Sequence, residues 1–154
     1  MEHKQLLTVF NSLPVGIGFF TADGTLVRCN ESFCRIFGAD SQTLLGNKLN
    51  INENSVVPDV VKEAVRRCVP VQMSFLYDFD KQRTDKRFFS TRTRTCYLKC
   101  NGNPLYDNDG KFVNYIFIFE DITETVKSEE VLRQSRRKTE LAMKAANIMF
   151  WEFD

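Results

Sequence analysis

The joint at Asp121-Ile122-Thr123 limits the possible folds of this chain more than any other feature of its sequence. Directly before it lies the apolar run Phe112–Phe119, which has the aromatic and β-branched content of a strand. Directly after it, residues 124–140 contain nine charged residues in seventeen, a composition typical of a solvated helix. The sequence therefore predicts a sheet whose last strand passes into a helix through a short polar joint.

Upstream of this joint, the pattern of apolar residues predicts both helices and strands. Leu6, Leu7 and Phe10 recur at helical spacing, so residues 1–13 are expected to form an amphipathic helix. Further helices are expected at 31–37, with Asn30 as N-cap and Gly38 as its stop, and at 41–46 and 55–68. Strand patterns occupy 15–20, 26–29, 71–79, 88–100 and 111–120. Residues 81–86 and 101–110 have turn composition, so the last three strands are expected to run antiparallel.

A second motif begins about a hundred residues before the joint, where residues 19–33 contain Thr21-Ala22-Asp23-Gly24 and lead into Phe37-Gly38. The two motifs, in this order and at this spacing, resemble the PAS family of small sensory domains over residues 4–124. The resemblance implies an α+β fold at residues 14–123: a five-stranded antiparallel sheet with helices on one face.

The resemblance also implies a role for the joint, in which Asp121 and Thr123 couple the sheet to an output helix. The residues alone leave an alternative, in which one of these side chains only caps that helix by binding free amides.

Sensing and relay within a longer protein is the function that the resemblance implies. Residues 124–140 resemble the charged linker helices of bacterial sensor proteins, and residues 141–154 resemble the truncated start of a second PAS module. We therefore expect a fragment of a multi-module signalling protein, commonly a two-component sensor histidine kinase, with downstream PAS and kinase modules as partners. A small ligand would bias the sheet. The alternatives are a ligand-free structural spacer that dimerises and, more remotely, nucleic-acid binding through Lys81–Lys99.

The two faces of the last strand predict a pocket and an interface, because successive side chains of a strand point to opposite faces. In light-sensing members of the resembled family, a glutamine two residues before the aspartate faces the flavin, so the resemblance implies that the face carrying Phe119 lines an internal pocket. The expected pocket residues are Phe33, Phe37, Val61, Val65, Phe75, Tyr77, Cys96, Leu98, Tyr115, Phe117 and Phe119. The opposite face, with Ile116 and Ile118, is expected to join Leu6, Leu7 and Phe10 in a homodimer interface. The plain alternative for each of these residues is ordinary core.

The residues that the sequence lacks argue against two cofactors. The single histidine, His3, lies outside residues 14–123, which argues against the histidine-ligated haem of some PAS domains. The string Cys34-Arg35-Ile36-Phe37 is the nearest match to the reactive-cysteine motif of the light-sensing subgroup, but it lies on a different helix. A covalent flavin is therefore not expected, whereas a non-covalent flavin or an unknown small ligand stays open.

The five cysteines are not expected to form a metal site or a disulfide framework, because their number is odd and no Cys-x-x-Cys spacing occurs. Cys96 and Cys100 would lie about 13 Å apart along a strand, too far for a disulfide. Cys29, Cys34 and Cys68 are expected as core residues. This cysteine usage favours a cytoplasmic location, although the parent protein can be membrane-anchored.

Charge and motifs argue against several other classes. The chain has 21 Lys and Arg against 20 Asp and Glu, so no global charge favours a nucleic acid or an anionic membrane. No apolar stretch of about 20 residues is present, and no membrane contact is expected from these residues. No Ser/His/Asp or Cys/His constellation can be built, so catalysis is not expected. Seven basic residues lie between Lys81 and Lys99, and simple alternation places Arg92 and Arg94 toward the pocket, which would suit an anionic ligand.

Overall fold

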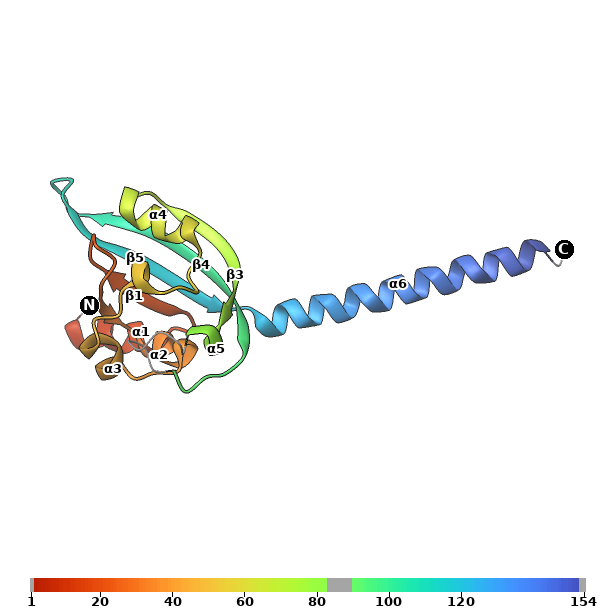
Figure 1. The fold of residues 1–154 in the computed structure, drawn as a ribbon, viewed down its shortest axis with the longest axis horizontal. Coiled ribbons are helices and arrows are strands. Elements are labelled where there is room, and N and C mark those ends of the chain that lie inside the picture. The colour runs from red at the N-terminus through yellow and green to blue at the C-terminus, as the bar shows by residue number, and fades with distance from the viewer. Residues whose placement is uncertain (1, 83–89, 153–154) are drawn as a thin grey trace. The chain divides into compact units, whose positions relative to one another are not determined.

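The computed structural model describes residues 2–82 and 90–152, drawn as a ribbon in Figure 1. In chain order its elements are α1 (His3–Ser12), β1 (Gly16–Phe20), β2 (Leu26–Cys29), α2 (Glu31–Phe37), α3 (Ser41–Gly46), the 3₁₀ helix η1 (Ile51–Glu53), α4 (Asp59–Arg67), β3 (Val71–Asp78), α5 (Phe79–Gln82), β4 (Thr95–Tyr106), β5 (Phe112–Asp121) and α6 (Thr123–Glu152).

The five strands form one sheet in the order β2-β1-β5-β4-β3, and every neighbouring pair runs antiparallel. The last strand, β5, therefore lies in the centre of the sheet, between β1 and β4. Helix α2 lies against β1 and β5, and helix α4 lies across β3 and β4 (Figure 1). The predicted α+β fold with a five-stranded antiparallel sheet is confirmed.

Asn30 starts helix α2 and also holds the chain that precedes it. Its Oδ1 atom accepts hydrogen bonds from the backbone N–H groups of Phe33, at 3.0 Å, and Ile17, at 2.8 Å. Its Nδ2 atom donates to the carbonyl of Phe10 at 2.9 Å. Gly38 ends the helix with a φ of 66°, a left-handed conformation that glycine adopts without a steric penalty. The predicted cap and stop of this helix are confirmed.

An aromatic core fills the space between the sheet and these helices. Strand β5 contributes Tyr115, Phe117 and Phe119 to its inner face, and all three are buried. Helix α2 contributes Phe33 and Phe37, whose ring centroids are 4.6 Å apart. Gly18 of β1 lets the ring of Phe33 pack directly against the strand backbone, because a Cβ atom at position 18 would lie only 2.8 Å from that ring.

Strand β4 begins and ends later than the sequence pattern predicts. Residues 90–94 lie outside any strand, whereas Asn101–Tyr106, expected as part of a turn, continue the strand. The reason is pairing on both sides: Asn101 lies opposite Gln72 of β3 and Ile118 of β5. Ladder hydrogen bonds to two neighbours outweigh the turn preference of this composition.

The end of β4 is compatible with its proline and is followed by a tight turn. Pro104 lies beyond the last β3 pair, Val71 with Gly102, so its missing N–H leaves no gap in that ladder. The actual turn starts at Asp107, whose Oδ1 accepts from the N–H groups of Asp109 and Lys111, both at 2.9 Å.

The short helix α5 takes the place of the predicted end of the third strand and the start of the following turn. Asp78 favours it, because its Oδ1 accepts from the N–H groups of Asp80 and Lys81, each at 3.0 Å. The rest of the predicted turn and the beginning of the predicted strand 88–100 fall in residues 83–89, outside the described residues.

Helix α1 places one aromatic side chain on the outer face of the sheet. Phe10 contacts Phe19 of β1, with ring centroids 6.0 Å apart, and the guanidinium carbon of Arg28 lies 5.5 Å from the centroid of the Phe10 ring. Phe19 pairs with Ile116 of β5, so these side chains share the outer face. Leu6 and Leu7, on the same helix, are exposed.

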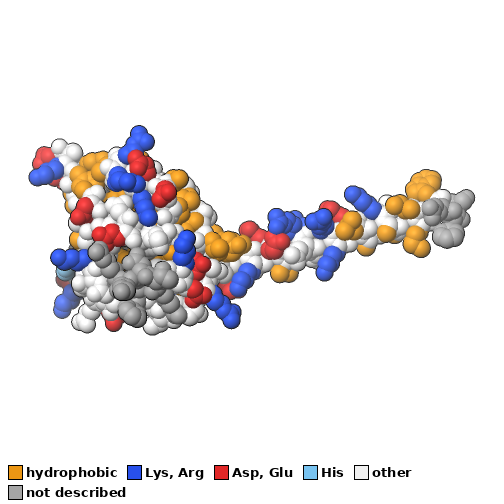
Figure 2. Space-filling model, viewed as in Figure 1, with side chains coloured by type: hydrophobic (Ala, Val, Ile, Leu, Met, Phe, Trp, Pro, Cys, Tyr) orange, Lys and Arg blue, Asp and Glu red, His pale blue; other side chains and the backbone are white. Residues whose placement is uncertain are grey.

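The chain divides into two compact units, residues 1–121 and 122–154. The second unit consists mainly of α6, which continues through the predicted boundary between 140 and 141 without a break. Trp151 and Glu152 are helical, and residues 153–154 lie outside the described part. Basic and acidic side chains alternate with scattered exposed apolar ones along this helix (Figure 2). Within the described residues, no helix is long and apolar enough to cross a membrane.

Candidate ligand pocket and signal joint

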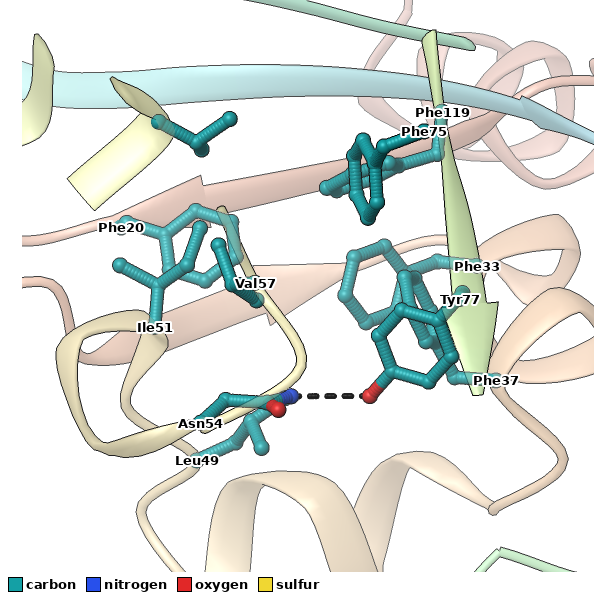
Figure 3. A pocket seen from close by; sticks show the side chains of 11 residues that line it. Phe20, Phe33, Phe37, Leu49, Ile51, Asn54, Val57, Phe75, Tyr77 and Phe119 are labelled. Carbon is teal, nitrogen blue, oxygen red and sulfur yellow. Dashed lines mark hydrogen bonds between the residues drawn. The ribbon is translucent and has the colours of Figure 1, made fainter. Parts of the chain in front are cut away.

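An apolar cavity of about 30 Å³ lies between the sheet and the helices (Figure 3). Its lining consists of six aromatic residues, four aliphatic residues and one asparagine: Phe20, Phe33, Phe37, Phe75, Tyr77, Phe119, Leu49, Ile51, Val57, Val61 and Asn54. None of the described residues that line it is charged. A buried water occupies about 10–15 Å³ on this scale, so the cavity has room for about two.

The lining comes from two kinds of structure. Strands β1, β3 and β5 and helices α2 and α4 supply Phe20, Phe33, Phe37, Val61, Phe75, Tyr77 and Phe119. The connection between α3 and α4, which includes η1, supplies Leu49, Ile51, Asn54 and Val57.

One hydrogen bond joins these two parts of the wall. Asn54 donates from Nδ2 to the hydroxyl of Tyr77 at 2.8 Å, as the dashed line in Figure 3 shows. The Oδ1 atom of the same asparagine accepts from the N–H of Val56 at 3.0 Å. Asn54 therefore shapes its own turn and also connects that turn to strand β3.

The structure places six of the eleven expected pocket residues around the cavity: Phe33, Phe37, Val61, Phe75, Tyr77 and Phe119. The other five are buried in the core away from the cavity lining: Val65, Cys96, Leu98, Tyr115 and Phe117. Sequence reasoning missed Phe20 and the four residues of the α3–α4 connection. The signal for Leu49 and Ile51 was the presence of apolar residues in a segment that otherwise has loop composition.

The second candidate feature is an ion pair at the joint. Arg92 donates from Nη1 to Oδ2 of Asp121 at 3.2 Å and to the carbonyl of Ile36 at 2.8 Å. Its guanidinium carbon lies 4.8 Å from the centroid of the Phe79 ring. The two charged side chains are 32% and 29% exposed. Arg92 thus contacts the end of β5, the last turn of α2 and the first residue of α5.

This geometry corrects the expectation that Arg92 and Arg94 face the pocket. The simple alternation of a strand does not hold there, because residues 90–94 are not in a strand. Arg94 has a φ of 65°, and its N–H donates to Oδ2 of Asp80 at 3.2 Å. Neither of these two arginines is therefore among the described residues that line the cavity. Three of the seven basic residues between Lys81 and Lys99 fall in 83–89, outside the described residues: Arg83, Lys86 and Arg87.

The cysteines lie in two environments. Burial raises the pKa of Cys96 to about 11, and the nearby Asp121 carboxylate adds to the rise while Arg92 opposes it. Burial also raises the pKa of Cys100 to about 11. Cys29 and Cys34, expected in the core, are half-buried, and their Sγ atoms lie 3.9 Å apart. Burial raises the pKa of Cys29 to about 12, so this thiol stays protonated at neutral pH.

Metal binding has no obvious site in this arrangement. Across residues 2–82 and 90–152, no group of three or more His, Cys, Asp or Glu side chains is placed to hold an ion.

The surface expected to form a dimer interface lies on the outer face of the sheet and on α1. Ile116 and Ile118 are half-buried there, next to Phe19 and Ile17 of β1 in the strand register. Phe10 is half-buried against Phe19, which connects it to this strip. Leu6 and Leu7 remain exposed, at 54% and 42%.

Comparison with known proteins gives a consistent result. A family model described as the PAS fold matches residues 10–127. The structure is similar to the PAS domain of a protein from Colwellia psychrerythraea, with a TM-score of 0.59 and 16% identity, over 79% of this chain and 97% of that one. It is also similar to a PAS domain from a two-component sensor histidine kinase, with a TM-score of 0.55 and 14% identity, over 77% of this chain and 94% of that one.

A third similar structure is a domain of a sensory box sensor histidine kinase/response regulator from Geobacter sulfurreducens. The TM-score is 0.52 and the identity 15%, over 77% of this chain and 92% of that one. At these identities the likeness shows the fold. No curated protein matches the sequence.

Proposed function

The chain belongs to the PAS-fold family, and we propose that residues 14–123 are a sensory and signal-relay domain of a multi-module bacterial signalling protein. In this proposal, a small ligand in the cavity between sheet and helices is the input. The helix that follows Asp121 carries the output. The observation that supports it most is the ion pair between Arg92 and Asp121. Both acceptors of Arg92, the Asp121 carboxylate and the Ile36 carbonyl, lie within two residues of a side chain that lines the cavity.

Two short routes connect the cavity to this ion pair. Phe119 lines the cavity and lies two residues before Asp121 on the same face of β5. Phe37 also lines the cavity and directly follows Ile36, whose carbonyl accepts the second hydrogen bond of Arg92. A ligand that displaces either ring moves an acceptor of Arg92. The start of α6, two residues after Asp121, would respond.

The strength of this ion pair suits a switch better than a structural support. A partly exposed ion pair contributes about 0–1 kcal/mol, which is small beside the total stability of a folded domain of about 5–15 kcal/mol. Coupling energies between sites are typically about 1–3 kcal/mol, so a contact of this size, together with the adjacent hydrogen bond, can bias an equilibrium without unfolding the domain.

The class of the output module is proposed from the proteins in which similar domains occur. Two of the similar structures come from sensor histidine kinases, which supports a parent protein of that class. The charged, continuous α6 would then be the linker that joins this domain to downstream PAS and kinase modules, with Asp121 and Thr123 as the coupling residues.

Amide hydrogen exchange on the chain tests the relay proposal without any ligand. We expect Arg92→Gln to speed exchange at residues 36–38 and 121–126, because both acceptors lose their charged donor. Exchange in the rest of the central pair β4–β5, before residue 121, should stay unchanged. Asp121→Asn should give the same pattern at 121–126. The matched control is Arg66→Gln, which removes an exposed ion pair with Glu63 of 3.3 Å on α4. If the Arg92 variant exchanges like the Arg66 control at 121–126, the ion pair does not hold the joint.

A ligand-free spacer that dimerises is the second candidate function, favoured by one observation. The cavity of about 30 Å³ is much smaller than the 150 Å³ that accommodates a benzene ring. On this reading, the half-buried strip of Phe10, Phe19 and Ile116 with the exposed Leu6 and Leu7 forms a homodimer interface, and dimer geometry alone sets the output. A homodimer is expected on both readings.

A further inference from the structure

The composition of the cavity wall restricts the charge of any molecule that enters it. Among the residues that the structure describes, eleven line the cavity: ten are apolar or aromatic, and the remaining one, Asn54, is uncharged. Removing an ionised group from water is costly unless an opposite charge or several hydrogen bonds compensate, and the described residues of this wall offer neither. Arg92 is engaged with Asp121 at the joint and not with the cavity. A ligand of this cavity is therefore neutral.

The aromatic side of the wall favours a flat ring. The rings of Phe37 and Phe119 lie 5.2 Å apart at 88°, and those of Phe37 and Tyr77 lie 5.5 Å apart at 77°. These are edge-to-face contacts in the range that aromatic pairs prefer, and one more ring can join such a cluster by the same geometry. A wall that is mostly apolar gives a polar molecule few partners, which favours a hydrocarbon over a polar molecule of the same size.

The present volume requires one part of the wall to move before a ring can enter. We use the term flap for residues 54–57, which lie between η1 and α4. Leu49 and Ile51, earlier in the same connection, are fixed to the first hairpin by backbone hydrogen bonds, Leu26 N–H to Leu49 O at 2.8 Å and Ile51 N–H to Gly24 O at 2.9 Å. These residues are poor candidates for movement.

The flap is attached differently. Its backbone hydrogen bonds are local: the N–H of Val57 donates to the carbonyl of Asn54 at 3.2 Å, and the N–H of Val56 donates to the Asn54 side chain. Within the described residues, the bond that reaches from the flap to the sheet is the one from Asn54 to the hydroxyl of Tyr77. Val57 packs its side chain into the cavity. The flap is also held by the packing of Val57, which is buried in the core. Opening the hydrogen bond to Tyr77 removes the polar contact between flap and sheet, and outward movement of Val57 then enlarges the cavity on that side.

We propose that the cavity binds a small, neutral, single-ring aromatic molecule, and that such a molecule is admitted when the hydrogen bond between Asn54 and Tyr77 opens and the flap moves outward. The inference rests on the proposed function in one respect, which is that the ligand is the input to the relay. The ring of Tyr77 lies 4.8 Å from that of Phe79, and Arg92 lies over Phe79, so release of the Tyr77 hydroxyl acts close to the ion pair.

The test is titration of the full chain with toluene as the probe, followed by heteronuclear NMR. We expect saturable shifts at the flap, at Phe37 and at Phe119. Benzoate, which has the same ring with a charge, should produce no saturable shifts at these residues. Val61→Ile adds one carbon to the wall of the cavity and should weaken toluene binding.

Two tyrosine variants distinguish release of the flap from a general loss of stability. Tyr77→Phe keeps the ring and removes the hydroxyl that holds the flap. It should bind toluene about 2- to 12-fold more tightly, the range given by the net contribution of one hydrogen bond. Tyr115→Phe makes the same chemical change at a buried tyrosine whose hydroxyl donates to the carbonyl of Val69 at 2.5 Å, away from the cavity lining. Its affinity for toluene should equal that of the wild type.

Three results would overturn the inference. They are an absence of saturable toluene shifts in both the wild type and Tyr77→Phe, equal binding of benzoate, or an equal gain from Tyr115→Phe and Tyr77→Phe. These outcomes are independent of the relay proposal, because the exchange experiment on Arg92→Gln needs no ligand.

Discussion

Truncation of Phe37 gives the most direct measure of how the core and the cavity depend on each other. Its side chain is 6% exposed, and its ring contacts those of Phe33, Tyr77 and Phe119 at centroid distances of 4.6, 5.5 and 5.2 Å. Replacing a buried phenylalanine by alanine typically costs about 3–5 kcal/mol, and the loss increases with the volume of the void that remains.

The void should be large at this site, because it would merge with the existing cavity of about 30 Å³. The neighbouring rings hold one another in place, which limits collapse around the missing side chain. We therefore expect Phe37→Ala to lower the free energy of unfolding by about 4 kcal/mol, toward the middle or upper part of the usual range.

Equilibrium unfolding in urea, with the slope of the transition as a check on two-state behaviour, measures this loss. Phe75→Ala is the matched control, because Phe75 lines the same cavity but is only half-buried. It should cost about 1–2 kcal/mol, since part of that ring is already in contact with water. A loss below about 1 kcal/mol for Phe37→Ala, or one no larger than that of Phe75→Ala, would refute the reasoning.

Two further predictions concern the outer face and the buried acids. We expect the chain to sediment as a homodimer at high micromolar concentration and Ile116→Lys to yield a folded monomer. The control Ser74→Lys, on the same face of the sheet but away from the strip, should leave the dimer intact. A monomeric wild type would contradict this prediction. We also expect stability to be constant up to about pH 9 and to fall as pH rises toward 12. Burial raises the pKa of Cys96 and Cys100 from 9.0 to about 11 and that of Tyr115 from 10.0 to about 12. The unfolded chain therefore releases these protons at lower pH than the folded chain, which favours unfolding as pH rises. Urea unfolding at pH 7, 9 and 10.5 checks the sign, and stability that rises above pH 9 would show that these groups ionise more easily in the fold.

Local rules predicted the parts of the fold that local interactions control. Helix α2 has its cap and its stop within its own sequence, at Asn30 and Gly38, and both work as expected. The last strand and its transition to a helix were predicted from apolar pattern and charge, and β5 ends at Asp121. The fold class followed from these elements and from a family resemblance.

The errors occurred where distant parts of the chain decide the local structure. Asn101 and Gly102 have turn composition, yet β3 and β5 pair with them on both sides and keep them extended. Arg92 was assigned to the pocket by alternation, which requires a regular strand that residues 90–94 do not form. Its acceptors, at Ile36 and Asp121, lie 56 and 29 residues away in the sequence, and no local pattern indicates them.

The candidate cavity was predictable only in part for a similar reason. Alternation along β5 identified Phe119, and helical spacing in α2 identified Phe33 and Phe37. Asn54 was not identified, because a single asparagine in a loop carries no sign that its amide reaches a tyrosine 23 residues later.

The unbroken course of α6 has a consequence for any module attached to its far end. Its thirty residues correspond to a rod of about 45 Å, at about 1.5 Å for each residue. Along such a rod, each added residue turns the far end by about 100°, since one turn contains about 3.6 residues. Seven added residues lengthen the rod by two turns and leave its rotational phase within about 20° of the original. A module attached there would therefore read angular phase as well as distance, and two linkers of nearly equal length can present opposite faces of that module to the same partner.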